Sequence, residues 1–169
     1  MTTRSSENPI EVLLVEDNPA DARLTEEILK DSEYAVNFSV VEDGEAAMTY
    51  LRRQGEHAYT ARPDLVLLDL NLPRKSGQEV LAEMNEDSNL RNIPVMILTG
   101  TAAEQSLLFS YNIPPSRFCR KPIDVPRFDA VVGQLDALSE RPLVMGTPPA
   151  ARQAASSGGG RKWWWPFGR

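Results

Sequence analysis

Short apolar runs alternate along the chain with longer segments in which apolar residues recur at helical spacing. The runs are too short for helices and are rich in leucine, isoleucine and valine, so they predict buried strands. The strands expected in this way cover residues 10–15, 34–41, 65–70, 93–98 and 117–120. The third run, LVLLDL, is apolar except for Asp69, which is typical of a central parallel strand covered on both faces.

Each expected strand is followed by a segment with helical periodicity. These segments cover residues 20–30, 45–53, 78–86, 102–111 and 125–138. The last of them carries an apolar face made of Phe128, Val131, Val132, Leu135 and Leu138. Before the first, Asn18 is a good helix cap and Pro19 suits the first helical position. Five strand–helix repeats predict an α/β fold, a doubly wound parallel sheet with helices on both faces and right-handed crossovers.

The same pattern divides the chain into three parts. Residues 1–8 form a polar arm, residues 9–139 hold all the expected elements, and residues 140–169 form a tail. Pro, Gly, Ala and Ser dominate much of that tail, so we expect it to be flexible. It closes with RKWWWPFGR, where Trp163, Trp164 and Trp165 beside basic residues suit docking to a membrane interface or to another protein. The alternative is that the segment RKWWWPFGR has no function that selection maintains.

Charge separates the tail from the rest of the chain. Residues 143–169 hold four basic residues and no acidic one, whereas the other 142 residues hold 14 basic residues against 24 acidic ones. An acidic body argues against nonspecific binding of nucleic acid and suits a divalent cation or a basic partner. The single cysteine, Cys119, excludes an internal disulfide framework. With no secretory signal and no apolar run near the ~20 residues of a membrane helix, we expect a cytoplasmic protein.

Polar residues gather where the expected strands end. Glu16 and Asp17 follow the first strand, and Asp69 closes the third. Thr99 ends the fourth strand, and Lys121 follows the fifth. Because the carboxyl ends of parallel strands form one edge of a sheet, these side chains should converge there.

Such a cluster limits the chemistry that it can support. Three close carboxylates repel one another, and at least one should have a raised pKa unless a cation neutralises them. Hard oxygen ligands select Mg²⁺ or Mn²⁺. A carboxylate can accept a phosphoryl group, and a nearby lysine and hydroxyl would stabilise its charge. Singly, Glu16 and Asp17 are more often a helix-start pair, Thr99 a cap and Lys121 a surface residue, whereas Asp69 inside an apolar strand is costly without partners. Their joint occurrence at successive strand ends predicts a site for a divalent cation and a phosphoryl group.

Five motifs in order resemble those of two-component receiver domains. They are VEDNPAD (15–21), PDLVLLDLNLP (63–73), SG (76–77), ILTGTA (97–102) and FCRKPID (118–124). The resemblance covers about residues 9–139. It implies a flavodoxin-like sheet of strand order 2-1-3-4-5 and a single-domain response regulator that takes a phosphoryl group from a histidine kinase. No DNA-binding or enzymatic output domain is expected, and its only catalysis would be its own phosphorylation and dephosphorylation.

The resemblance also implies residue roles. Asp69 would be the phosphoacceptor, and the Mg²⁺ ligands would be Glu16, Asp17, Asp69 and the backbone carbonyl of Asn71. Lys121 would contact the phosphoryl group and precede a cis bond to Pro122. Thr99 would move toward that group, and Phe118 would turn inward behind it, which changes the face made by the fourth helix, fifth strand and fifth helix (102–111, 117–120, 125–138). Static core packing is the alternative for Phe118.

Further stretches are similar to the small receivers that partner phytochrome-type histidine kinases, including bacteriophytochromes. The EDNPAD start, the loop RRQGEHAYTARPD and the stretch SYNIPPSRFCRKP carry this similarity. Such relatives often form homodimers through the fourth helix, fifth strand and fifth helix, so we expect a dimer. His57, the only histidine, lies in the long loop, and we expect it to be exposed rather than a phosphodonor or ligand.

Two other functions compete with this interpretation. A haloacid-dehalogenase-type phosphatase also uses a strand-end aspartate and Mg²⁺, but it needs a second aspartate two residues later, where this chain has Asn71. A degenerate receiver that serves only as a protein-binding scaffold is the other alternative.

Overall fold

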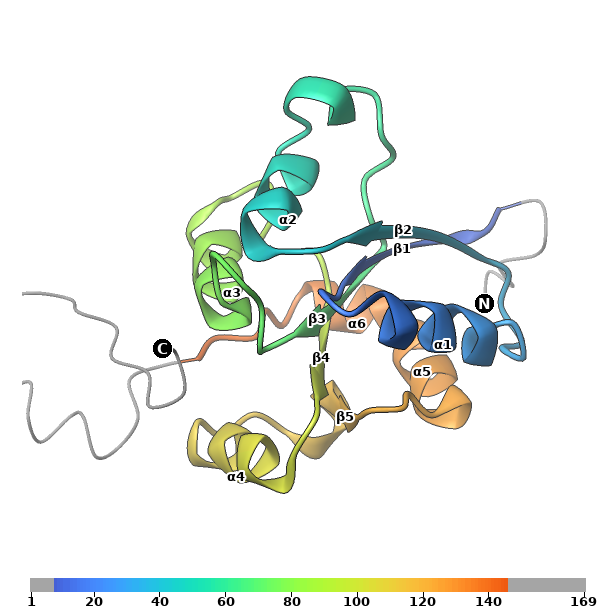
Figure 1. Cartoon of the computed structure of the whole chain (residues 1–169), viewed down its shortest axis with the longest axis vertical. Helices are drawn as coiled ribbons and strands as arrows, with labels where there is room; N and C mark the ends of the chain where they lie inside the picture. Colours follow the sequence, from blue (N-terminus) through green and yellow to red (C-terminus); the bar gives the residue numbers. More distant parts are fainter. Residues whose placement is uncertain (1–7, 146–169) are drawn as a thin grey trace, which may run out of the picture.

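The computed structural model describes residues 8–145, which form one five-stranded parallel sheet with helices on both sides (Figure 1). The strands are β1 Ile10–Val15, β2 Val36–Val41, β3 Leu65–Asp69, β4 Val95–Thr99 and β5 Phe118–Arg120. Their spatial order is β2-β1-β3-β4-β5, so the predicted doubly wound fold is confirmed. The order reverses direction at β1, which places β1 and β3 side by side in the middle of the sheet.

The helices occupy most of the segments with helical periodicity. They are α1 Pro19–Leu29, α2 Gly44–Leu51, α3 Gly77–Glu86, α4 Ala102–Ser110, α5 Val125–Val132 and α6 Leu135–Ser139. Two short 3₁₀ helices, Gly55–His57 and Pro115–Arg117, lie in the loops before β3 and β5. Side chains cap the helix starts at the carboxyl edge of the sheet: the Asn18 oxygen accepts the N–H of Ala20 at 2.9 Å, and Ser76 forms a capping box with Glu79.

Alternate residues of the strands pack into two separate hydrophobic cores, because successive side chains of a strand point to opposite faces of the sheet. On one face α1, α5 and α6 cover the sheet around Phe128, the largest fully buried side chain. On the other face α2, α3 and α4 contribute residues such as Met84 and Leu108. The central strands β1, β3 and β4 are therefore almost wholly buried, which fixes the position of their carboxyl ends.

The last predicted helix is wrong in one respect. The apolar face runs through residues 125–138 as expected, but the helix stops at Val132 and a second one, α6, begins at Leu135. Gly133 caps the first helix, and Gln134 leaves helical geometry with φ −116° and ψ 13°. Glycine costs helix stability, while the apolar spacing continues across it. Periodicity alone therefore conceals the break.

Packing continues beyond the predicted domain boundary at residue 139. Leu143 is buried in the core that contains α3, and its carbonyl accepts the side-chain N–H of Asn85 at 2.5 Å. The buried guanidinium of Arg117 donates to the carbonyls of Val95 and Arg141, which ties this segment to the start of β4. The arm predicted at residues 1–8, apart from Asn8, and the Trp-rich segment lie outside the described residues.

The loop between α2 and β3 differs from the expectation for His57. Its ring is half-buried and packs against Tyr50, with ring centroids 4.9 Å apart. His57 is therefore part of the packing of the loop rather than a freely exposed side chain.

Within residues 8–145, no helix combines the length and apolar character required to cross a lipid bilayer.

Candidate functional site

The acidic residues predicted from the strand ends do converge at the carboxyl edge of the sheet. Asp69 is the last residue of β3, and its neighbour in the register is Leu98 of β4. Glu16 follows β1 directly, and both carboxylates are almost completely buried, with 1% and 3% of Glu16 and Asp69 exposed. Asp17 is exposed beside them. Each of the three offers a carboxylate oxygen, and these atoms lie within 4.8 Å of one another.

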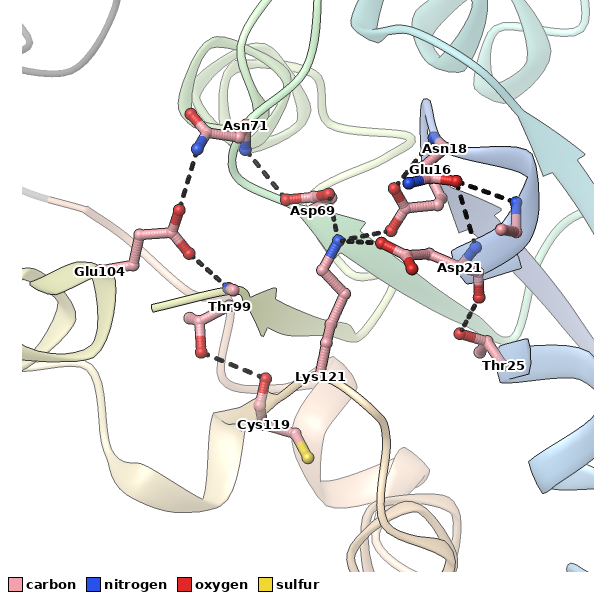
Figure 2. A network of polar contacts seen from close by, with 12 residues as sticks. Glu16, Asn18, Asp21, Thr25, Asp69, Asn71, Thr99, Glu104, Cys119 and Lys121 are labelled. Carbon is pink, nitrogen blue, oxygen red and sulfur yellow. Dashed lines mark hydrogen bonds and ion pairs between the residues drawn. The ribbon is translucent and has the colours of Figure 1, made fainter. Parts of the chain in front are cut away.

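Lys121 joins the cluster from the far side, just after β5 (Figure 2). Its Nζ donates to Glu16 Oε2 and to Asp69 Oδ2, both at 2.9 Å. The peptide bond between Lys121 and Pro122 is cis, as expected. A third partner was not predicted: Asp21 Oδ2 of α1 lies 3.2 Å from the same nitrogen. A single ammonium therefore contacts three carboxylates, those of Glu16, Asp21 and Asp69, and neutralises only part of their negative charge.

Burial and charge act in opposite directions on these groups. Burial raises the pKa of Glu16 above its ordinary value, the hydrogen bond from Lys121 lowers it, and the charge of Asp69 raises it again. For Lys121, burial lowers the pKa, but the hydrogen bonds to Glu16 and Asp69 outweigh it and raise the pKa above its ordinary value. Lys121 is therefore a firmly charged ammonium, while Glu16 ionises at some cost.

The donor set fits a hard divalent cation. Carboxylate oxygens from Glu16, Asp17 and Asp69 are the ligand type that Mg²⁺ and Mn²⁺ prefer, and the exposed Asp17 leaves the cluster open to water on one side. Asn71, the fourth predicted ligand, is adjacent, and its backbone N–H donates to Asp69 Oδ1 at 3.0 Å. The ligand role of its carbonyl stays a prediction.

The two predicted switch residues lie behind the acidic cluster. Thr99 is fully buried, and its hydroxyl donates to the Cys119 carbonyl at 3.4 Å, on the side away from Asp69 (Figure 2). Phe118 is also buried and meets the ring of Phe109 edge to face, with centroids 5.3 Å apart. The Thr99 hydroxyl therefore holds a weak bond that a stronger acceptor near Asp69 could replace.

One further residue of the network was not predicted. Glu104, in the first turn of α4, is only 8% exposed. Its two carboxylate oxygens accept the N–H of Gly100 at 2.6 Å and the side-chain N–H of Asn71 at 2.9 Å. In sequence it looks like an ordinary acidic residue at a helix start, and no local signal distinguishes it.

Comparison with known proteins shows which family the chain belongs to. The model of the response regulator receiver domain matches residues 12–132. The chain belongs to this family. As a receiver domain, it carries the acidic cluster, the strand-end aspartate and the lysine in the order in which the sequence motifs predicted them.

The most similar relatives include regulators of phytochrome systems. Response regulator Rcp1 of Synechocystis sp. is 46% identical over 108 residues, which cover 64% of this chain and 74% of that protein. The Mn²⁺-bound form of Rcp1 matches with a TM-score of 0.59 at 37% identity, over 82% of this chain and 100% of that chain. The bacteriophytochrome response regulator AtBRR gives a TM-score of 0.67 at 37% identity, over 76% of this chain and 94% of that one.

A third relative was solved in a modified state. The phosphorylated cyanobacterial phytochrome response regulator RcpA matches with a TM-score of 0.60 at 39% identity, over 83% of this chain and 99% of that chain. These comparisons confirm the predicted family and its place among two-component response regulators similar to those of phytochrome systems. An Mn²⁺-bound relative and the acidic cluster together indicate a site for a divalent cation.

Proposed function

We propose that this receiver accepts a phosphoryl group on Asp69 from a phosphohistidine of a histidine kinase. The observation that carries the proposal is the position of the Asp69 carboxylate: it lies at a strand end, 2.9 Å from the Lys121 ammonium and within 4.8 Å of two further carboxylates. A buried carboxylate in an otherwise apolar strand is costly without a purpose-built set of partners. Here the partners are those that phosphoryl transfer requires, a cation site and a fixed positive charge.

In the transfer, an Asp69 carboxylate oxygen attacks the phosphorus of the phosphohistidine. The P–O bond forms as the P–N bond breaks, the electron pair stays on the imidazole, and that nitrogen takes a proton from water. Hydrolysis reverses the modification: a water oxygen attacks phosphorus as the bond to Asp69 breaks, the electron pair returns to the Asp69 carboxylate, one proton of the water passes to solvent, and inorganic phosphate leaves. Lys121 donates to the oxygens that gain charge in both steps.

The proposed cofactor is Mg²⁺, with Mn²⁺ as a substitute. Glu16, Asp17, Asp69 and the carbonyl of Asn71 would hold it, and it would supply charge neutralisation for the carboxylates and the phosphoryl oxygens. Around it, the chain's own groups orient the acceptor: the Asn71 N–H fixes Asp69 Oδ1, and Lys121 fixes Oδ2.

The proposed switch begins with the Thr99 hydroxyl. A phosphoryl group adds negative charge and three acceptor oxygens at Asp69. Thr99 exchanges its 3.4 Å bond to the Cys119 carbonyl for a bond to the new group. Phe118, packed on Phe109, adjusts with it and alters the surface made by α4, β5 and α5. The same surface is the proposed homodimer interface.

The proposed partner is a histidine kinase of the phytochrome type, because the relatives named above are phytochrome and bacteriophytochrome response regulators. The acidic body supports a protein partner and no nucleic acid. Location in the cytoplasm and docking by the Trp-rich end remain predictions from the sequence.

The test is phosphorylation with acetyl phosphate and Mg²⁺, followed by intact-mass spectrometry. We expect one phosphoryl group on the wild type, none on Asp69→Asn, and loss of the signal with a chelator. If no adduct forms, binding of beryllofluoride with Mg²⁺ separates a short-lived phosphoprotein from an inert fold. Absence of both would refute the proposal in favour of a protein-binding scaffold.

A further inference from the structure

Glu104 has an unusual pair of partners for a carboxylate at a helix start. It is the third residue of α4, and its backbone N–H donates to the hydroxyl of the cap residue Thr101 at 3.2 Å. Its side chain reaches past that cap to the N–H of Gly100 and also contacts Asn71 in a different loop. Within residues 8–145 it forms no ion pair. Its buried charge is therefore satisfied by these hydrogen bonds.

The two loops that Glu104 joins both lie next to the phosphoacceptor. Asn71 comes two residues after Asp69, and its N–H bonds the Asp69 carboxylate. Gly100 follows β4, in which Leu98 is the register partner of Asp69. Figure 2 shows the Glu104 carboxylate between Asn71 and the end of β4, beside the acidic cluster. Both Asn71 and Gly100 are exposed, so a group arriving on Asp69 meets this junction.

We propose that Glu104 is a positioning residue that opposes the phosphorylated arrangement of the site. The inference rests on the proposed phosphorylation of Asp69. A phosphoryl group brings acceptor oxygens that need N–H donors at the strand edge. In the unphosphorylated protein Glu104 already holds the Gly100 N–H at 2.6 Å and keeps Asn71 turned toward α4. The new group must compete with Glu104 for this donor and also lies close to its negative charge.

The chain offers a matched comparison in Glu79. This residue is also the third of its helix, α3, and its carboxylate also accepts a backbone N–H, from Ser76 at 2.7 Å. It is exposed and closes a capping box within its own helix start. Replacing Glu79 by glutamine therefore removes the same charge from the same helical position, while the link between the loops beside Asp69 stays intact.

The experiment is calorimetric titration of Mg²⁺-saturated protein with beryllofluoride, a noncovalent mimic of the phosphoryl group. Glu104→Gln keeps an oxygen for the Gly100 N–H but loses the charge, and a charged acceptor is roughly twice as strong as a neutral one. Glu104→Ala removes the competitor. We expect beryllofluoride to bind about three- to tenfold more tightly to Glu104→Gln, and more tightly still to Glu104→Ala, with Glu79→Gln within about twofold of the wild type.

Titration with Mg²⁺ alone distinguishes this role from a purely structural one. Loss of the negative charge in Glu104→Gln should leave the affinity for Mg²⁺ unchanged or weaken it, whereas the affinity for beryllofluoride should rise. A loosened site would weaken both, and that outcome, or unchanged beryllofluoride affinity in Glu104→Gln, overturns the inference. If Glu104→Ala does not fold in thermal melts, the glutamine variant decides. A wild type that binds no beryllofluoride and takes no phosphoryl group refutes the proposed function itself.

Discussion

Replacement of Lys121 by methionine tests whether repulsion among the carboxylates governs this site. Methionine keeps much of the apolar stem but removes the ammonium that donates to Glu16 and Asp69. Both carboxylates are almost fully buried, so the variant leaves two close negative charges with reduced solvation. The expected result is a large loss of stability at neutral pH.

The size of the loss follows from the burial of the partners. Breaking a buried ion pair by removing one partner costs about 3–5 kcal/mol. The Lys121 side chain is 21% exposed, and water reaches that side of the cluster, so we expect about 2–4 kcal/mol at pH 7. Without Lys121 the pKa of Glu16, already raised by burial, rises further. A carboxyl whose pKa is raised on folding favours the native state at low pH and loses that contribution as pH rises through the folded pKa.

Urea unfolding at several pH values measures both parts of this prediction. The difference between wild type and Lys121→Met should be largest near neutral pH and shrink as pH falls toward 4.5, the ordinary value for Glu16. Millimolar Mg²⁺ should restore much of the lost stability, because a cation that binds only the folded protein stabilises it. Mg²⁺ should also bind the variant about tenfold more tightly, since a competing positive charge is gone.

Lys75 provides the control. It forms an ion pair with one carboxylate, Glu83, and both side chains are about a quarter exposed. Lys75→Met should cost no more than about 1 kcal/mol, as partly exposed pairs do, and its difference in stability from the wild type should not change with Mg²⁺. A Lys121 variant that loses as little as this, or whose loss does not change with pH and Mg²⁺, would refute the reasoning.

Three further results are expected. Gly77→Ala would place a Cβ 2.3 Å from the Asp69 carbonyl oxygen, so it should cost about 1–3 kcal/mol in urea unfolding and weaken Mg²⁺ binding in calorimetry. Phe128→Ala empties the centre of one core and should cost about 3–5 kcal/mol in urea unfolding. Burial raises the pKa of the Cys119 thiol, so the unfolded chain loses this proton first and stability should fall as pH rises past 9.0. Cys119→Ala should make that fall smaller, and a thiol reagent should label Cys119 only after unfolding.

The sheet and its edge could be predicted because their signal is local. Each strand is a short apolar run, and a polar residue inside or directly after such a run marks the carboxyl edge, as with Asp69 and Lys121. The parallel arrangement then brings residues far apart in sequence to one place. The order of elements alone was enough for this part of the site.

The remaining features depend on tertiary contacts that leave no pattern. Asp21 and Glu104 lie in first helical turns, where acidic residues are ordinary, and only the fold shows that one contacts Lys121 and the other joins two loops. The break at Gly133 interrupts the helix without interrupting its apolar face. Leu143 packs into the core and its carbonyl accepts a hydrogen bond from Asn85, and the composition of the segment after residue 139 indicates neither contact.

The long separation between Lys121 and the carboxylates also matters while the protein is being made. Lys121 lies 105 positions after Glu16 and 52 after Asp69. At about 5–20 residues per second, the ribosome adds Lys121 roughly 5–20 s after Glu16. A nascent chain that ends before β5 carries the acidic residues without their ammonium partner. The neutralised cluster therefore forms only after Lys121 has been synthesised and β5 has joined the sheet, so a chain that ends before Lys121 cannot carry the complete phosphoacceptor site.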